Sequence, residues 1–573
     1  MKRTRFARFA LLLLGALSFM VGSVDAQPSS IRPAPLNPDF VRYLADLRSG
    51  SSPKGFVPSA FVPQRTKSAS ALARTAPALE KSFDIAQYGW ATRVKDQAGW
   101  GTCWDFATVE AMESNLKKET GVDYDFSELH LGFFAYYDES ADRPAFDQTA
   151  DPAKKNPIFD NGGTAPKARA ILSRGTGPVN EADAPYPKTD IDPAVSKDEY
   201  LEYWRTYASD PEALKSRLLA TPNRFRLEES LVFTTSDDIK QALKEYGGLW
   251  FAFGSDAITS KPYIYSSRTS SEGGHAVLLV GWDDDFPREN FGDPFDEGRP
   301  PSSDGAWKIQ NSWSLDAGLG GYYWISYEHA TIFYDDGAAT FVAMPLDSYE
   351  HTYSHDPLGM VYALDVEGSS ARAANVFTAE RDESLVRVGF ETLGEGVGYA
   401  IQVYRNVPAG GMPDEGTPVY ALPQQGIADF SGYRNVALTT PVSLDAGERF
   451  AVVITFDSRA GELQIPVEAR IDGLTSKAVA KPRESYVKLT GAEDWSEVRT
   501  LLLSESDDDG NSIDIHCTNL CIKAFTNAAP GDSSSSGSSG GCQSGAFGMV
   551  VVGLLSLLFK GADRGAPKAV KPE

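Results

Sequence analysis

The stretch that most constrains the fold is residues 97–118, which read QAGWGTCWDFATVEAMESNLKK. In its second half, apolar residues recur at the spacing that is typical of an α-helix. Gly99 and Gly101 favour a tight turn just before that helix. The pattern therefore predicts that Cys103 lies in the first turn of a helix, shortly after Gln97.

A cysteine at this position has a distinctive electrostatic environment. The first turn of a helix presents unpaired N–H groups and the positive end of the helix dipole, and both stabilise a thiolate. Cys103 is therefore a candidate nucleophile, provided that a histidine elsewhere in the chain takes its proton. The alternative is a buried, inert cysteine, because free cysteine is a common core residue.

One histidine stands in a conspicuous pattern. Residues 273–282 read GGHAVLLVGW, which predicts an apolar strand with His275 at its start. The acidic, Pro- and Gly-rich residues 283–305 that follow indicate a surface loop. A lone histidine is usually structural, and we expect structural or exposed positions for the others: His130, His329, His351, His355 and His516.

Three segments together resemble the active-site motifs of papain-like cysteine peptidases. The family pattern Q-x-x-x-C-G-S-C-W-[AS]-F matches this chain at Gln97, Gly101, Cys103, Trp104 and Phe106. The strand that starts at His275 resembles the family's HAVxxVGY strand. WKIQNSW, residues 307–313, resembles the segment that carries the family's catalytic asparagine, here Asn311. The motifs occur in the family's order of Cys, His and Asn.

The resemblance implies a role for each matching residue. Cys103 would be the nucleophile, and His275 would hold it as a thiolate and later protonate the leaving amine. Asn311 would orient the imidazole, and Trp313 would shield that hydrogen bond from water. Gln97 would donate to the oxyanion together with the backbone N–H of Cys103. No cofactor and no metal ion are implied.

Three positions depart from the family pattern. Trp100 stands where the family commonly has a disulfide-bonded cysteine, so that bond is absent. Thr102 replaces a serine, which is a mild change. Asp105 adds a negative charge near Cys103 and would oppose thiolate formation if it pointed at the sulfur.

A glycine pair follows the active-site helix. Gly162 and Gly163 resemble the family's pair that lies along the cleft and binds substrate backbone to backbone. Glycine suits such a close approach because it carries no side chain. An ordinary turn is the alternative reading of the same residues.

The N-terminus has the features of an export signal. Basic residues precede an apolar run over 9–21, and a small-residue site ends at Ala26, so we expect a signal peptide over 1–26. A membrane anchor is the alternative, although the run is short for a span. Residues 27–78 are rich in Pro, Ser and Ala and predict a mostly irregular leader, either a short pro-segment or a plain linker.

Residues 346–528 predict a second, all-β domain. Short alternating runs, such as residues 450–456, lie between glycine-rich turns, which is typical of a β-sandwich. The arrangement resembles the lectin-like domain appended to some bacterial papain-like peptidases, which implies a possible carbohydrate ligand. A stabilising or spacer module is the alternative. Cys517 and Cys521 could form a small disulfide in an exported protein.

The C-terminus resembles a bacterial sorting tail. Residues 529–541 form a Ser/Gly-rich spacer, and 542–573 contain Cys542, a short apolar run and basic residues. The resemblance implies envelope attachment through this tail, with cleavage near Cys542. A simple membrane tail is the alternative.

The net charge of −24 argues against nucleic acid as a partner. We therefore expect an α+β, papain-like two-lobed domain over 79–345, followed by a lectin-like β-sandwich. The expected function is an exported peptidase of the bacterial cell surface or outer envelope, acting on proteins or peptides. The alternative is a catalytically silent surface binding protein that uses its lectin-like domain.

Overall fold

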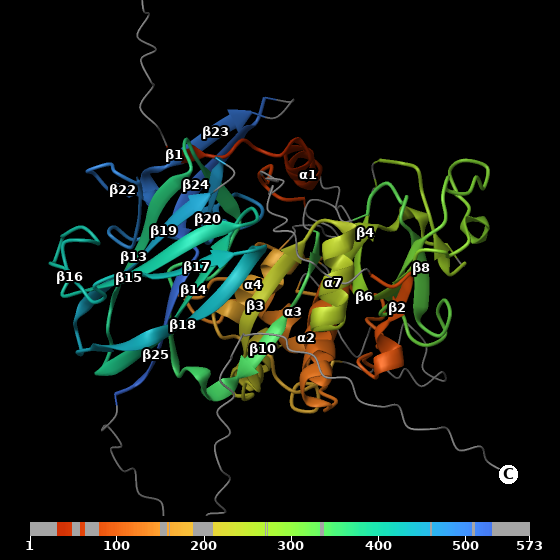
Figure 1. Ribbon diagram of the computed structural model, residues 1–573, viewed down its shortest axis with the longest axis horizontal. Helices are drawn as coiled ribbons and strands as arrows, with labels where there is room; N and C mark the ends of the chain where they lie inside the picture. Colours follow the sequence, from red (N-terminus) through yellow and green to blue (C-terminus); the bar gives the residue numbers. More distant parts are fainter. Residues whose placement is uncertain are drawn as a thin grey trace, which may run out of the picture. The chain divides into compact units, whose positions relative to one another are not determined.

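The computed structural model describes most of the chain between residues 31 and 529 (Figure 1). The described residues are 31–48, 58–63, 79–148, 158–159, 161–186, 210–259, 261–269, 271, 273–332, 337–458, 461–506 and 510–529. The predicted signal peptide and the tail with Cys542 lie outside them. The chain divides into two compact units, 1–529 and 530–573, and every described residue belongs to the first.

The α-helices lie in the first half of this unit. Their bounds are α1 Pro38–Arg48, α2 Cys103–Thr120, α3 Glu128–Tyr136, α4 Ala165–Ser173, α6 Pro211–Leu219 and α7 Ser236–Tyr246. As the sequence predicted, α2 begins at Cys103, and it ends where Gly121 adopts a left-handed conformation (φ 71°). Its residues are buried from Cys103 to Leu116, because α3, α4, α7 and strands of the adjoining sheet surround it.

Strands of the first half pack against α2. Their bounds are β2 Ser82–Asp84, β3 Phe225–Phe233, β4 Leu249–Gly254, β5 Tyr263–Ile264, β6 Gly274–Asp283, β7 Ala306–Gln310, β8 Tyr322–Ser326, β9 Ala338–Ala339 and β10 Val342–Pro345. β4, β6, β7 and β8 follow one another in antiparallel order. β6 is an almost wholly buried strand, as its apolar run predicted, and it starts one residue before His275.

The second half is built from strands, and α7 is the last α-helix among the described residues. The strand bounds are β11 His351–Tyr353, β12 Tyr362–Val366, β13 Ser370–Thr378, β14 Glu383–Thr392, β15 Val397–Arg405, β16 Thr417–Pro418, β17 Gln424–Ala428, β18 Ser431–Leu444, β19 Arg449–Ser458, β20 Leu463–Arg470, β21 Ser485–Leu489, β22 Ser496–Glu497, β23 Leu502–Ser506, β24 Ser512–Leu520 and β25 Ile522–Ala528. One sheet has the order β16-β15-β19-β13-β21-β22, with β17 beside β15.

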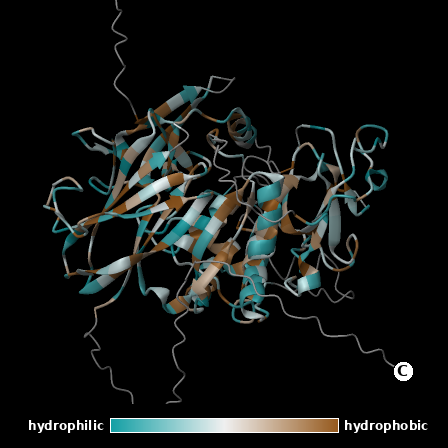
Figure 2. Cartoon of the chain, in the orientation of Figure 1, coloured by the Kyte–Doolittle hydropathy of each residue, from teal (hydrophilic) through white to brown (hydrophobic). Residues whose placement is uncertain are grey.

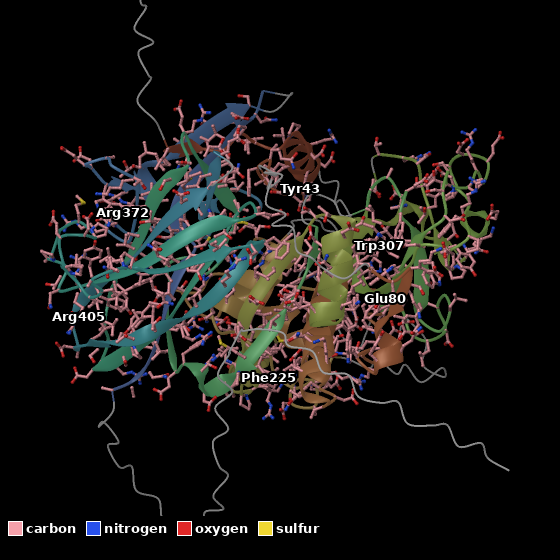
Figure 3. The ribbon with its side chains drawn as sticks, in the orientation of Figure 1. Tyr43, Glu80, Phe225, Trp307, Arg372 and Arg405 are labelled. Atoms are coloured by element: carbon pink, nitrogen blue, oxygen red, sulfur yellow. The ribbon has the colours of Figure 1, made fainter. Side chains whose placement is uncertain are left out.

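Apolar side chains on these strands form the core of this half. Phe450, Val452 and Ile454 lie on a strand, β19, and are fully buried, but Ala451 and Val453 between them are buried as well, so this strand is covered on both faces. Hydrophobic and hydrophilic residues alternate along many of these strands (Figure 2). Toward solvent, Arg372 and Arg405 lie on β13 and β15 (Figure 3), where they form ion pairs with Asp414 and Glu448 respectively.

The two halves share one sheet. The thirteen-stranded sheet runs from β11, β25, β14 and β18 directly into β3 and on to β4 and β6. β18 pairs with β3 from Ser431 opposite Val232 to Arg434 opposite Glu229. Backbone hydrogen bonds therefore join the strand-rich half to the half that contains Cys103, which the sequence did not predict.

The expected disulfide between Cys517 and Cys521 is absent, and both are buried free thiols. Cys517 lies on β24 and Cys521 just after its end. Cys517 to Leu520 belong to a strand, and a fully extended chain would separate the two cysteine Cα atoms by up to about 13 Å, which is roughly twice the span of a disulfide. The two cysteines are close in the sequence, but a strand between them holds their Cα atoms too far apart for a disulfide.

Candidate active site

The sulfur of Cys103 lies at the meeting point of α2 and β6. The backbone N–H of Ala276 on β6 points at Cys103 Sγ, with 3.5 Å between the nitrogen and the sulfur. Cys103 is also the first residue of α2, so the unpaired N–H groups of the helix start surround its side chain. Residues far apart in the sequence, 103 and 275–276, are thereby brought together.

The ring of His275 is held on two sides. Its Nε2 lies 2.7 Å from Asn311 Oδ1, and the indole of Trp313 stacks on it with 4.8 Å between ring centroids. Asn311 Oδ1 also accepts a hydrogen bond from the backbone N–H of Ser312 at 2.8 Å, which identifies this atom as the carbonyl oxygen. His275 Nε2 must therefore donate, and Nδ1 is the nitrogen that can take a proton.

Burial opposes charge on both groups. It raises the pKa of the Cys103 thiol to about 11 and lowers the pKa of His275 to about 4, the latter partly offset by the hydrogen bond that His275 donates to Asn311. Each group alone is therefore neutral at neutral pH. A thiolate can form here only together with an imidazolium, because each charge then stabilises the other.

The surroundings of Asp105 disfavour the charge that its position suggests. Its side chain is fully buried against α3, and its Oδ2 lies where a Cβ on Gly132 would have to sit. Burial, followed by the nearby Glu128 carboxylate, raises the pKa of Asp105 well above its usual range. Burial is the largest cause that raises the pKa of the Cys103 thiol and the Asp105 charge is a smaller one, which protonation of Asp105 would remove.

The side chain of Gln97 is fixed between two loops. Its Nε2 donates to the carbonyl of Trp100 at 2.7 Å, and its Oε1 accepts from Ser312 Oγ at 2.6 Å. The backbone N–H of Gln97 also donates to the Ser312 carbonyl at 2.9 Å. Ser312, which follows Asn311, thus orients the side-chain amide of Gln97. The second hydrogen of Gln97 Nε2 stays available for a ligand.

Sequence reasoning assigned no role to Tyr186, which braces the same loop. Its hydroxyl lies 2.8 Å from Thr102 Oγ1 and donates to the Gln97 carbonyl at 3.1 Å. It therefore ties both ends of the turn that leads into Cys103. Residues 175–187, which read GTGPVNEADAPYP, contain it and resemble a segment of papain-like peptidases, and this resemblance is the signal that could have found it.

The glycine pair lies against the start of α2. A Cβ on Gly163 would sit 2.3 Å from the ring of Trp104, the neighbour of Cys103. The carbonyl of Gly162 accepts a hydrogen bond from the Tyr136 hydroxyl, to which Lys167 Nζ in turn donates. Only glycine fits at position 163 without displacing the Trp104 ring, and the segment that contains it passes directly beside the start of α2.

Farther along, a buried ion cluster fixes α2 against α3. Lys95 Nζ lies 2.9 Å from Glu113 of α2 and 2.6 Å from Glu128 of α3. Glu113 also accepts a hydrogen bond from the backbone N–H of Phe126 at 2.7 Å. Loss of Lys95 would leave buried carboxylates without a counter-charge, so this cluster holds the helix in one position.

Two other site classes find no support in the described part of the chain. No group of three or more His, Cys, Asp or Glu side chains there is arranged to hold a metal ion. None of the helices in the described ranges has the length and hydrophobicity needed to traverse a bilayer.

Comparison with known proteins gives a matching family model for each half of the described chain. Residues 79–339 match the family model described as papain family cysteine protease, and residues 352–526 match that of the lectin-like domain. Among curated proteins, the probable cysteine protease RD19B of Arabidopsis thaliana is 27% identical over 253 residues, which cover 43% of this chain and 57% of the relative. Human cathepsin L2 is 26% identical over 244 residues, 43% of this chain and 60% of its own. The chain thus spans less than two thirds of these relatives.

Among solved structures, the chain resembles the cysteine protease and lectin-like domains of Cwp84, a surface layer associated protein of Clostridium difficile. The TM-score is 0.67 at 23% identity, and the match covers 87% of this chain and 98% of the other. The same clostridial protease after propeptide cleavage gives a TM-score of 0.60 at 24% identity, covering 78% and 99%. At this identity the likeness concerns the fold, a papain-like domain followed by a strand-rich lectin-like domain. Residues 79–339 therefore belong to the papain family of cysteine proteases, and residues 352–526 form a lectin-like domain.

Proposed function

We propose that this chain is a cysteine peptidase that hydrolyses peptide bonds with Cys103, His275 and Asn311. The proposal rests on one observation: helix α2 and strand β6 meet at Cys103 Sγ, and Asn311 holds the imidazole of His275 beside them. Cys103 begins α2, the backbone N–H of the residue after His275 points at its Sγ, and Asn311 holds His275 Nε2 at 2.7 Å. This arrangement leaves His275 Nδ1 as the proton acceptor for the thiol.

The reaction follows from these positions. The thiol proton of Cys103 passes to His275 Nδ1, and the thiolate attacks the scissile carbonyl carbon. The imidazolium then protonates the leaving amine, so that the C–N bond breaks and a thioester remains. His275 next takes a proton from water, the hydroxide attacks the thioester carbonyl, and the restored thiol leaves with the proton.

The negative oxygen of each tetrahedral intermediate needs donors that are already oriented. We assign this role to the Cys103 backbone N–H and the Gln97 side chain, whose Nε2 has a hydrogen free after bonding the Trp100 carbonyl. Loss of one such donor typically costs about 3 kcal/mol of barrier. Ser312, through its 2.6 Å hydrogen bond to Gln97 Oε1, holds that donor in place.

Proteins or peptides in extended conformation are the proposed substrates. Gly162 and Gly163 offer backbone groups without side chains beside the nucleophile helix, which suits pairing with a substrate strand. We further propose a peptidase domain over 79–345 and a lectin-like domain over 346–528, with a carbohydrate as the candidate ligand of the latter.

We also propose that the protein is exported and held at the bacterial cell surface or outer envelope. The predicted signal peptide and the tail with Cys542 support this, and the structural neighbour Cwp84 is described as surface layer associated. A membrane or envelope attachment would use the tail, after residues 529–541.

A fluorogenic peptide panel tests the catalytic proposal on the full chain after removal of its leader. We expect turnover that Cys103→Ala abolishes and that Cys517→Ala, a change at another buried thiol, leaves unchanged. A thiol-directed covalent inhibitor should label Cys103, and His275→Ala should lose that labelling.

Two outcomes would contradict the proposal. Turnover that survives Cys103→Ala would exclude this nucleophile. Absence of turnover across the panel, with a folded chain and an unlabelled Cys103, would favour a silent surface binding protein that acts through its lectin-like domain.

A further inference from the structure

The leader contacts the lectin-like domain through its backbone. Strand β1, Ile31–Pro33, pairs antiparallel with β12 from Ile31 opposite Val366 to Pro33 opposite Leu364. It is thereby the edge strand of the five-stranded sheet β1-β12-β20-β24-β23, whose other members all belong to the lectin-like domain. The backbone N–H of Ala34 continues the pairing with a 3.0 Å hydrogen bond to the Ala363 carbonyl.

A second leader segment, residues 58–63, closes over the first. The backbone N–H of Asn37 donates to the Ala60 carbonyl at 3.1 Å, and Phe61 forms a β-bridge with Leu36. Phe61 is buried, and its ring meets the edge of Tyr362 with 5.9 Å between centroids. The Tyr362 hydroxyl in turn donates to the Ala34 carbonyl. One lectin-like residue therefore holds both leader segments.

The helix between these segments is also anchored by apolar side chains. In α1 (red in Figure 1), Phe40 is fully buried and Leu44 is 2% exposed. Tyr43, labelled in Figure 3, is buried as well. A leader that merely linked two domains would expose these side chains, so they indicate a specific docked conformation.

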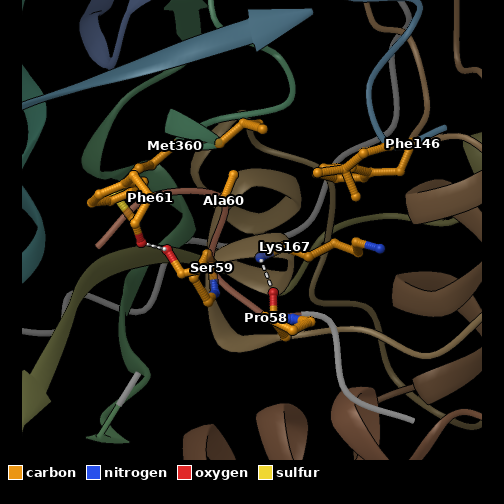
Figure 4. A pocket seen from close by; sticks show the side chains of 11 residues that line it. Pro58, Ser59, Ala60, Phe61, Phe146, Lys167 and Met360 are labelled. Carbon is orange, nitrogen blue, oxygen red and sulfur yellow. Dashed lines mark hydrogen bonds between the residues drawn. The ribbon is translucent and has the colours of Figure 1, made fainter. Parts of the chain in front are cut away.

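The docked leader also reaches the peptidase half beside its glycine pair. Residues 58–61 line a cavity of about 60 Å³ together with Thr164 and Lys167 of the peptidase half and Met360 and Leu474 of the lectin-like half (Figure 4). Thr164 directly follows Gly163. The same leader segment therefore contacts the lectin-like domain and shares a cavity with the residue that follows Gly163.

We propose that the lectin-like domain is the docking surface for the leader and retains residues 31–63 after the chain is cut between residues 63 and 79. The contacts that hold β1, α1 and Phe61 require no covalent connection to residue 79, because they consist of strand pairing and buried apolar side chains. A cut alone then leaves the surface beside Thr164 covered, and dissociation of the leader becomes a separate step. This proposal does not depend on catalysis.

The test uses the full chain with Cys103→Ala, so that the peptidase activity plays no part, and a specific protease site inserted between residues 63 and 79. After cleavage, size-exclusion chromatography under native conditions should show the leader co-eluting with the rest of the chain. Failure of the catalytic proposal would leave this result unchanged.

Matched variants then locate the contact. Phe61→Ala should weaken retention of the leader at least about tenfold, as expected for a buried aromatic anchor, whereas its neighbour Val62, 49% exposed, should tolerate Val62→Ala. On the lectin-like side, Tyr362→Phe keeps the ring but removes the hydrogen bond to the Ala34 carbonyl, and should shorten retention severalfold.

Three results would overturn the proposal. The leader of the unmodified sequence could separate from the cut chain on the column. Phe61→Ala and Val62→Ala could have equal effects. Tyr362→Phe could leave retention unchanged, which would place the leader's binding energy on the peptidase half instead.

Discussion

Replacing Gly163 by alanine tests the contact between the segment of Gly162 and Gly163, which we propose pairs with the substrate, and helix α2, which begins at Cys103. The new Cβ would sit 2.3 Å from Trp104 Cδ2 and 2.4 Å from Cε2. Carbon atoms in ordinary contact are about 3.5–4.0 Å apart, so the segment or the ring must move by more than about 1 Å. Trp104 is 1% exposed, and its carbonyl accepts hydrogen bonds from Thr108 and Trp250, so we expect the segment to move.

We expect the displacement to lower both the stability of the protein and its kcat/KM. Overpacking of this kind costs about 1–3 kcal/mol of stability. A shift of about 1 Å in a substrate-positioning group can lower kcat/KM about 100-fold. Because Gly163 does not have a positive φ, the effect of Gly163→Ala is steric and not conformational.

The assay is kcat/KM on a fluorogenic peptide, with active sites counted by a thiol-directed inhibitor and stability followed by thermal unfolding. Gly398→Ala on β15 is the matched control, since its Cβ would lie 3.5 Å from the nearest atom, the Asp457 carbonyl oxygen. A second change, Trp104→Phe, should restore part of the activity of Gly163→Ala. Activity of Gly163→Ala within threefold of the parent, at an unchanged Tm, would refute the reasoning.

Three further predictions concern the site and the lectin-like half. Asn311→Ala should lower kcat about 100-fold with little change in KM, because it frees the imidazole of His275; an unchanged kcat would remove its orienting role. Tyr186→Phe should lower kcat about three- to tenfold at constant Tm, the equivalent of one hydrogen bond, and a pure loss of stability would count against a positioning role. Burial raises the pKa of Glu468 to about 8, so the folded state binds this proton more tightly than the unfolded state. The resulting stability is present below about pH 4.5 and is lost as pH rises through about 8, by up to about 5 kcal/mol. Glu468→Gln should therefore raise Tm at pH 8 but not at pH 4.5, and an equal shift at both would contradict the assignment.

Local patterns predicted what depends on local structure. The start of α2 at Cys103 followed from the two glycines before it and the helical period after it. The strand that carries His275 followed from its apolar run, and the strands of the second half followed from period-two alternation. Motif order indicated which residues belong together, and the structure brings Cys103, His275, Asn311 and Gln97 into one site.

Contacts between distant segments could not be predicted in the same way. The pairing of β18 with β3 joins residues 431–434 to 229–232, and nothing in either strand's composition specifies the other. The docking of β1 on β12 depends on a sheet edge that exists only in the folded chain. The disulfide prediction failed for a related reason, because sequence spacing does not report the distance between Cys517 and Cys521 once both follow an extended path.

The orientation of Asp105 was also beyond the sequence. A carboxylate two residues after the nucleophile could point at the sulfur or away from it, and the helix period alone does not decide this. The structure buries Asp105 against Gly132, where the low polarity favours its protonated form. Gly132, which has no side chain, makes room for Asp105. The sequence of neither helix indicates that Asp105 of α2 would pack against Gly132 of α3.

The most direct test of the central claim is the rate at which iodoacetamide alkylates Cys103 as a function of pH, read by mass spectrometry of the digested chain. Burial, with a smaller contribution from the Asp105 charge, raises the pKa of this thiol to about 11, so a cysteine without a partner would react slowly below that pH. Proton transfer to His275 predicts rapid alkylation of Cys103 near pH 6 to 7, strongly reduced in His275→Ala, while the buried Cys517 and Cys521 stay unmodified. Alkylation of Cys103 that rises only toward pH 11, and equally in His275→Ala, would contradict the account.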